Sequence, residues 1–303
     1  MSSAIPDSVQ LDGGGFYSYL ATPYDAAGDV DLGLLDEYVS AIVDSGVAGV
    51  TCLASTCEGP YLMDEEWVAV AKTVGKAVNG RARLAIGVGA LSTRQAIRKA
   101  QLARDAGATC LMMEMQQYFP VTFEAAYRHY ESVAAAVALP IRLYNLPGPT
   151  HFDFTPERIA KMSGIAAIQS VKEASGDVLR ILEIRAVCAS RYNIHCGFHF
   201  QALEGMRMGA GGWEVMLHPL IAKPCIELFE TLRADPWGAA GEARFRKLQP
   251  LFLFFRQNGV PQSIKAMSAW TDLPLGKPRE PYAELTPEQK SKLRQIVGEL
   301  GLS

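Results

Sequence analysis

The chain has 303 residues, of which 49% are hydrophobic and 20% are charged, and its formal net charge is −3 at pH 7. This composition is typical of a globular protein, and the evenly spread charge offers no basic patch for nucleic acid. No apolar run reaches the roughly 18 residues of a membrane-spanning helix, so we expect neither nucleic acid nor a membrane as a partner.

The polar start of the chain, residues 1–15, lacks the charged and apolar regions of a signal peptide. We therefore expect a flexible lead-in and a cytoplasmic protein. Six cysteines, at positions 52, 57, 110, 188, 196 and 225, form no CxxC pair, which indicates reduced thiols that mostly fill the core. The histidines form no HExxH or HxH array, and the HCGFH stretch from His195 to His199 contains a glycine at an expected strand end. We predict no metal site.

Eight short, β-prone apolar segments recur along the chain. They span residues 16–22, 48–54, 82–88, 108–114, 139–145, 166–172, 192–197 and 212–217. Their apolar residues are continuous rather than alternating, which indicates strands buried on both faces in a parallel sheet under helices.

The segments between these strands have helical periodicity. Residues 32–46 and 93–107 each end in the glycine that commonly follows a helix, and residues 155–162 begin with a favourable Thr-Pro start. Eight strand-helix units in roughly 220 residues predict a (β/α)8 barrel, which we place at residues 16–221. No GxGxxG motif follows the first strand, so an open dinucleotide-binding sheet has no local support.

After the eighth strand the pattern is purely helical, over residues 218–234, 238–257, 260–270 and 286–300. This pattern predicts a C-terminal helical extension, residues 222–303, that packs on the barrel. The LFLFF run at residues 251–255 is expected in the core or in a subunit interface.

Three separate segments bring reactive groups to the carboxyl ends of the predicted strands, where barrel active sites lie. Lys172 ends the sixth strand, Tyr144 ends the fifth, and the turn ASTCEG (54–59) follows the second. Burying an ammonium group alone is costly, so a lysine placed directly after an apolar run is expected to be paired or neutralised. A neutral Lys172 would attack a carbonyl carbon and form a Schiff base. Alternatively, Lys172 reaches solvent and pairs with Glu173.

The motifs LATPYDAAGDVD, YNLPGPT and KEASGD, and the spacing of about 28 residues between Tyr144 and Lys172, resemble one known family. Over nearly its full length the sequence is similar to the dihydrodipicolinate synthase / N-acetylneuraminate lyase family of class I aldolases and dehydratases. The resemblance implies that Lys172 is the Schiff-base lysine. It also implies that the Tyr144 hydroxyl shuttles protons to and from the substrate oxygen.

The resemblance extends to the turn after the second strand, which in the family usually reads GTTGE. It implies that Ser55 and Thr56 bind the carboxylate of a 2-oxo acid, and that Thr56 assists Tyr144 in proton transfer. Ala54 and Cys57 replace the two glycines, which leaves the turn geometry open.

The resemblance also predicts a shared site between subunits. Tyr118, in QQYFP, matches a tyrosine that many family members insert into the neighbouring subunit's site. The family implies a homotetramer built as a dimer of dimers.

Three departures from the family bear on the substrate. Pro149 stands where lysine-pathway synthases carry an arginine that holds the aldehyde's carboxylate. His199 lies where the family often has an aspartate, and Glu214 replaces an apolar residue of the eighth strand. We predict that Glu214 and His199 bind the substrate, with Glu214 also a candidate acid or base. Alternatively, Glu214 points outward against a helix and His199 is a structural hydrogen-bonding residue.

The resemblance and these departures predict a Schiff-base lyase that acts on pyruvate or another 2-oxo acid. It would be an aldolase or a dehydratase of a 2-keto-3-deoxy sugar acid, without cofactor or metal, because the iminium withdraws the electrons. One alternative is a 4-hydroxy-tetrahydrodipicolinate (dihydrodipicolinate) synthase with an altered aldehyde clamp. Another is a catalytically silent 2-oxo acid binding protein. The sequence does not decide the natural substrate, the stereochemistry or the direction of flux.

Overall fold

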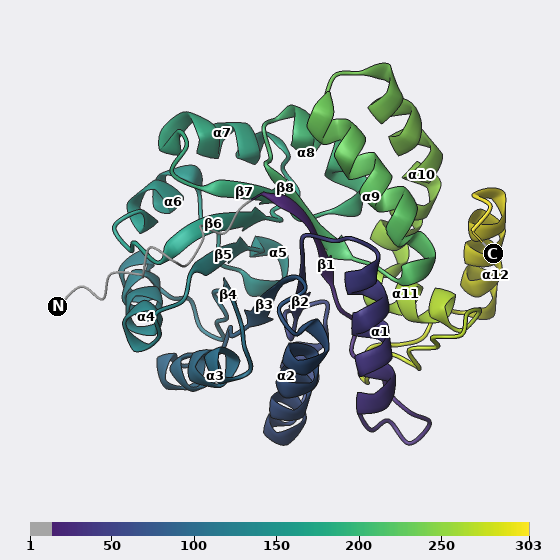
Figure 1. The fold of residues 1–303 in the computed structure, drawn as a ribbon. Coiled ribbons are helices and arrows are strands. Elements are labelled where there is room, and N and C mark those ends of the chain that lie inside the picture. The colour runs from purple at the N-terminus through teal and green to yellow at the C-terminus, as the bar shows by residue number, and fades with distance from the viewer. Residues whose placement is uncertain (1–13, 303) are drawn as a thin grey trace.

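The structure, a computed structural model, describes residues 14–302, so most of the predicted lead-in lies outside the described part of the chain. Eight parallel strands form a closed barrel in chain order, and β8 pairs with β1 (Figure 1). Each strand overlaps one predicted segment, which confirms the (β/α)8 fold. The strands are β1 (Gly15–Tyr19), β2 (Gly49–Cys52), β3 (Arg83–Gly87), β4 (Cys110–Glu114), β5 (Ile141–Asn145), β6 (Ile168–Glu173), β7 (Asn193–Cys196) and β8 (Gly212–Met216).

Helices alternate with the strands and cover the outside of the barrel (Figure 1). Asp31 and Thr155 cap α1 and α6 by accepting a hydrogen bond from the backbone N–H three residues on. Gly46 and Gly107 adopt a φ of about +90° just after α1 and α3, where an L side chain would be strained. The helices are α1 (Leu32–Asp44), α2 (Asp64–Val78), α3 (Thr93–Asp105), α4 (Phe123–Ala136), α6 (Pro156–Met162), α7 (Leu179–Cys188), α8 (Ala202–Arg207) and α9 (Pro219–Ala234), with a four-residue α5 (Pro147–Thr150) after β5.

The C-terminal extension contains α10 (Ala239–Asn258), α11 (Val260–Ser268) and α12 (Pro287–Glu299), and lies on one side of the barrel (Figure 1). The predicted boundary between residues 221 and 222 falls inside α9. Because α9 follows β8 and packs against α1, it is the eighth helix of the barrel, and the extension starts with α10. In the LFLFF run of α10, four side chains are buried and Leu253 is 37% exposed, so the run mainly forms core.

Two further features of residues 14–302 bear on the predictions. No helix in this range combines the length and the apolarity needed to cross a membrane. All six cysteines are free thiols, and every one of them except the partly exposed Cys188 is buried. Their burial agrees with the expected role as core fillers.

The inside of the barrel contains a buried ionic layer. The Glu214 carboxylate on β8 lies 2.9 Å from an Arg142 guanidinium nitrogen on β5 and accepts a hydrogen bond of 2.5 Å from Thr51 on β2. The Arg142 guanidinium also stacks over the Tyr17 ring, 4.3 Å from its centroid, and donates to Ser170. Both members of the ion pair are fully buried. Glu214 therefore points into the barrel, and the alternative in which it faces an outer helix is wrong.

The turn after β2 is anchored to the C-terminal extension by a second buried ion pair. Glu58 has a left-handed backbone with φ of +62°, and its carboxylate lies 3.1 Å from the Lys265 ammonium of α11. Lys265 also donates to the Lys277 carbonyl oxygen, and its ammonium lies 4.0 Å from the centroid of the Tyr24 ring. Both charged side chains are 1% exposed. The conformation of the turn therefore depends on a helix far away in the sequence.

Replacing Lys265 with methionine should leave the Glu58 carboxylate buried without its counter-charge. We expect the free energy of unfolding to fall by about 3–5 kcal/mol. Removing both charges, with Glu58→Gln and Lys265→Met together, should recover much of this loss, because no uncompensated charge then stays buried. Urea unfolding of the single and double variants measures both effects. Equal losses in Lys265→Met and in the double variant would contradict this account of the turn.

Candidate active site

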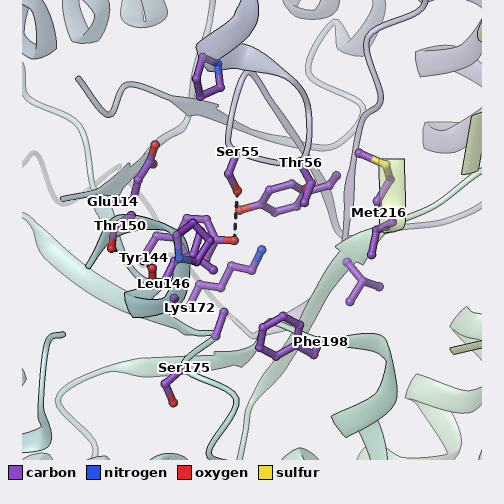
Figure 2. A pocket seen from close by; sticks show the side chains of 18 of the residues that line it. Ser55, Thr56, Glu114, Tyr144, Leu146, Thr150, Lys172, Ser175, Phe198 and Met216 are labelled. Carbon is purple, nitrogen blue, oxygen red and sulfur yellow. Dashed lines mark hydrogen bonds between the residues drawn. The ribbon is translucent and has the colours of Figure 1, made fainter. Parts of the chain in front are cut away.

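A cavity of about 530 Å³ lies at the carboxyl ends of the barrel strands (Figure 2). Its polar groups include residues at the ends of β4, β5 and β6, in the turn after β2 and in the segment after β7. Much of the remaining wall is apolar or aromatic: Tyr61, Leu146, Phe198 and Met216, together with Val260 and Tyr282 of the C-terminal extension. The cavity is therefore large enough for a small organic substrate.

Lys172 extends into this cavity from β6 (Figure 2). The residue is 3% exposed, and its amine lies 3.6 Å from the centroid of the Tyr19 ring and 4.3 Å from that of Tyr144. Gly197, just after β7, lies tightly against β6: a Cβ there would lie 2.7 Å from the Ala174 Cβ and 3.1 Å from the Lys172 Cε. The predicted placement of Lys172 at the strand end, facing a sheltered cavity, is what the structure shows.

Burial lowers the pKa of Lys172 from 10.5 to about 8, because the charged form loses its hydration. The Glu214 carboxylate in the layer below acts in the opposite direction, and Arg142 reinforces the effect of burial. The alternative in which Lys172 pairs with Glu173 is wrong. The Glu173 carboxylate instead accepts hydrogen bonds from the Ser175 N–H at 2.5 Å and from the Asn145 side chain at 2.9 Å.

The Tyr144 hydroxyl lies 3.3 Å from the Ser55 hydroxyl (Figure 2). Tyr144 and Lys172 are register partners on adjacent strands, so both side chains enter the cavity at the same level. Burial raises the pKa of Tyr144 well above 10, which keeps the phenol protonated at neutral pH. We predicted Thr56 as the hydroxyl that assists Tyr144. The structure instead places Ser55 in contact with the phenol, while Thr56 lines the cavity.

The turn that carries Ser55 and Thr56 has unusual backbone geometry at its ends. Leu53 and Glu58 both have a φ of +62°, a conformation that costs a non-glycine residue energy and that often marks functional sites. Between them, Ala54 and Cys57 have negative φ, which explains how they replace the family's glycines without strain. The backbone N–H groups of Ser55 and Thr56 donate no hydrogen bond within the described residues, and both residues line the cavity.

The structure gives the remaining predicted residues different positions. Glu214 is not part of the cavity wall, because it is buried in the ionic layer and paired with Arg142, so direct substrate binding by Glu214 is not supported. His199 lines the cavity, but its Nε2 donates to the Met216 carbonyl oxygen at 2.9 Å. Burial lowers the pKa of His199 to about 4, so its ring is neutral. Tyr118 is 84% exposed and lies outside the cavity wall of its own chain.

The sequence analysis missed one acidic residue of the cavity. Glu114, the last residue of β4, is 3% exposed and lines the cavity wall (Figure 2). Its position as the last residue of the fourth predicted strand was the available signal. Within residues 14–302, no group of three or more His, Cys, Asp or Glu residues is arranged to hold a metal ion.

Comparison with known proteins agrees with the fold. A family model described as the dihydrodipicolinate synthetase family matches residues 13–300. The chain is 30% identical over 301 residues to 4-hydroxy-tetrahydrodipicolinate synthase from Prochlorococcus marinus, which covers 98% of this chain and 99% of the relative. The protein of the same name from Microcystis aeruginosa is 32% identical over 286 residues, 93% of this chain and 95% of that protein.

A solved structure gives the same result in three dimensions. The crystal structure of dihydrodipicolinate synthase from Agrobacterium tumefaciens matches with a TM-score of 0.88 at 27% identity, over 95% of this chain and 98% of that one. The family match spans nearly the whole chain, and two of the motifs that suggested it, YNLPGPT and KEASGD, line one cavity. The chain therefore belongs to the dihydrodipicolinate synthetase family and is an enzyme of the aldolase-type lyase class.

Proposed function

We propose that the protein is a Schiff-base-forming lyase that acts on pyruvate or another 2-oxo acid. It works as an aldolase or as a dehydratase of a 2-keto-3-deoxy sugar acid. The observation that carries this proposal is the Lys172 amine, which is buried in the cavity with a pKa of about 8. Its neutral, nucleophilic form is therefore accessible near neutral pH. No further electron sink is required, since the iminium takes that role.

The reaction begins when the free N–H groups and hydroxyls of Ser55 and Thr56 bind the substrate carboxylate. The Lys172 nitrogen adds to C2, and the resulting carbinolamine loses water to give the iminium. The protonated Tyr144 hydroxyl, in contact with Ser55, supplies the proton that leaves with that water and takes one back at hydrolysis.

The iminium accepts electrons either from the C3–C4 bond, as in aldol cleavage, or from a C3–H bond, as in dehydration. Both routes give an enamine. Reprotonation of this enamine after cleavage, or expulsion of the C4 hydroxyl as water after loss of the C3 proton, precedes the hydrolysis that frees Lys172. The two routes need the same lysine and the same proton relay, so the geometry supports either one.

We further propose that a homotetramer completes the relay. Tyr118 and Phe119 are 84% and 76% exposed, and their rings stack edge to face 5.1 Å apart. Two adjacent aromatic side chains in water are costly unless another surface covers them. A neighbouring subunit that buries this pair would take Tyr118 into its own site, as the family resemblance suggests.

A second candidate is 4-hydroxy-tetrahydrodipicolinate synthase itself, the name that relatives at 29–32% identity carry. Their coverage of nearly the whole chain favours it. The cavity disfavours it, because Pro149 stands at the clamp position and no arginine lines the wall of the described cavity. An incoming aldehyde with a carboxylate would therefore lack a charge-assisted contact.

Incubation with pyruvate and sodium borohydride should reduce the Schiff base and fix a pyruvate-derived adduct on Lys172. Intact-mass and peptide mass spectrometry locate the adduct. Lys172→Ala should abolish it, and Lys161→Ala, which removes a lysine outside the cavity, should leave it unchanged. An unmodified Lys172 in a protein that demonstrably binds pyruvate would favour the silent binder instead.

The rate of adduct formation should depend on pH through Lys172. The neutral amine is the nucleophile, so the rate should rise about tenfold per pH unit below the pKa of about 8 and level off above it. Quenched-flow trapping between pH 5.5 and 9.5, with intact mass as the readout, measures this profile. A rate that still rises about tenfold per pH unit up to pH 9.5, as for an ordinary lysine with a pKa of 10.5, would mean that the amine is not desolvated in solution.

Aspartate semialdehyde separates the two candidate functions. We expect its condensation with pyruvate to have a kcat/KM at least about tenfold below that of the best substrate in a panel of sugar acids and uncharged aldehydes. Pro149→Arg should raise kcat/KM for aspartate semialdehyde, whereas the matched Pro149→Ala should not. If wild-type protein prefers aspartate semialdehyde to the whole panel, the synthase is the correct function.

A further inference from the structure

Glu114 is an acidic group in the cavity that the reaction described above does not use. One carboxylate oxygen, Oε1, accepts a hydrogen bond of 2.7 Å from the Gln116 side chain. The other, Oε2, is buried and has no hydrogen-bond partner among the described residues. A buried carboxylate oxygen without a partner is unfavourable, so its position at a cavity wall indicates a missing ligand.

The surrounding chain is built to accommodate this carboxylate. Gly89 has no side chain where one would collide with it, because a Cβ there would lie 2.5 Å from the Glu114 carboxyl carbon. Burial raises the pKa of Glu114, and the Gln116 amide and the charges of Lys99 and Lys172 oppose that rise. Neither lysine forms an ion pair with it in the described structure. The carboxylate thus lies in electrostatic range of Lys172, and its buried Oε2 has no hydrogen-bond partner among the described residues.

The charges of the cavity wall restrict what can bind beside the 2-oxo acid group. Among the described lining residues, Lys172 is the single lysine or arginine and Glu114 the single carboxylate. His199 is neutral at physiological pH. Once Lys172 is joined to the substrate, a second carboxylate on that substrate would find no cation to pair with and would face Glu114. A hydroxyl group would instead donate to Oε2.

We propose that Glu114 determines specificity for the part of the substrate beyond C3. It accepts a hydrogen bond from a hydroxyl there and discriminates against a second carboxylate. The preferred substrate class is therefore a 2-oxo acid whose remaining chain is uncharged and hydroxylated. This inference rests on the proposed Schiff-base function, and it assigns to that site a residue outside the lysine, tyrosine and carboxylate-turn motifs.

Three five-carbon acids test the selectivity: racemic 4-hydroxy-2-oxopentanoate, 2-oxopentanoate and 2-oxoglutarate. For each acid, borohydride trapping on Lys172 gives the concentration at which adduct formation is half-maximal, and this value is expressed relative to that of pyruvate. If the enzyme cleaves an acid and releases pyruvate, the adduct of that pyruvate is added to the adduct of the intact acid. In wild-type protein the hydroxy acid should be captured about tenfold better than 2-oxopentanoate, and 2-oxoglutarate about tenfold worse. Capture of 2-oxoglutarate as good as that of the hydroxy acid would overturn the proposal without any variant.

Glu114→Gln keeps the shape of the side chain and removes its charge. The preference for the hydroxy acid should fall several-fold, and the discrimination against 2-oxoglutarate should fall about tenfold. Glu131→Gln, which removes the same charge from an exposed position on α4, should leave both ratios unchanged. Wild-type ratios in Glu114→Gln would show that this carboxylate does not select the substrate.

The same panel distinguishes failure of this inference from failure of the proposed function. If pyruvate gives no adduct on Lys172, the Schiff-base function is wrong, and isothermal titration calorimetry of the three acids then measures the selectivity directly. If pyruvate is trapped but the three acids are captured equally, the function stands and the role of Glu114 is wrong.

Discussion

The removal of one amine from water is the constraint on which this site depends. A shift in the Lys172 pKa from 10.5 to about 8 corresponds to a free-energy difference on the order of 3 kcal/mol between its two protonation states. The barrel provides this environment through two aromatic rings against the amine and a glycine just after β7 that lies tightly against β6. Each comes from a different strand, so the reactive state of the lysine is a property of the closed barrel.

The ionic layer beneath the amine limits the size of that shift. Glu214 stabilises the ammonium form of Lys172 across the barrel interior, and Arg142 both neutralises Glu214 and disfavours the ammonium. Burial alone would raise the pKa of Glu214, but the charges of Arg142, Lys172 and His195 and the hydrogen bond from Thr51 lower it on balance. The carboxylate therefore stays ionised as a fixed negative charge below the reacting nitrogen. Its contribution is electrostatic, although it touches no part of the cavity.

Strand and helix positions were predictable from sequence because they depend on local patterns. Continuous apolar segments marked all eight strands, and the glycines after α1 and α3 marked helix ends. Lys172 and Tyr144 could be placed for the same reason, since each ends a strand. The direction of a side chain within the barrel was not predictable. Glu214 was expected at the mouth, but the register of β8 turns it into the interior opposite Arg142.

Contacts between distant segments were also beyond the sequence. Which hydroxyl touches Tyr144 depends on the fold of the turn after β2, so Ser55 could not be told from Thr56. Glu114 was not singled out from the sequence, because the space for its carboxylate comes from the missing side chain of Gly89 on a neighbouring loop. Both omissions have the same origin. The relevant neighbour lies on another strand-loop unit, and no local pattern encodes it.

The pairing of Glu58 with Lys265 has a consequence for how the protein is made. The two residues are 207 positions apart, so a ribosome completes all eight barrel strands before it adds the cation that holds the turn after β2. Until then that turn carries an unmatched negative charge and two left-handed residues without their anchor. A nascent or truncated polypeptide that ends before α11 would thus contain every residue proposed for the Schiff-base chemistry. It would lack the ion pair that fixes the turn proposed to bind the keto acid.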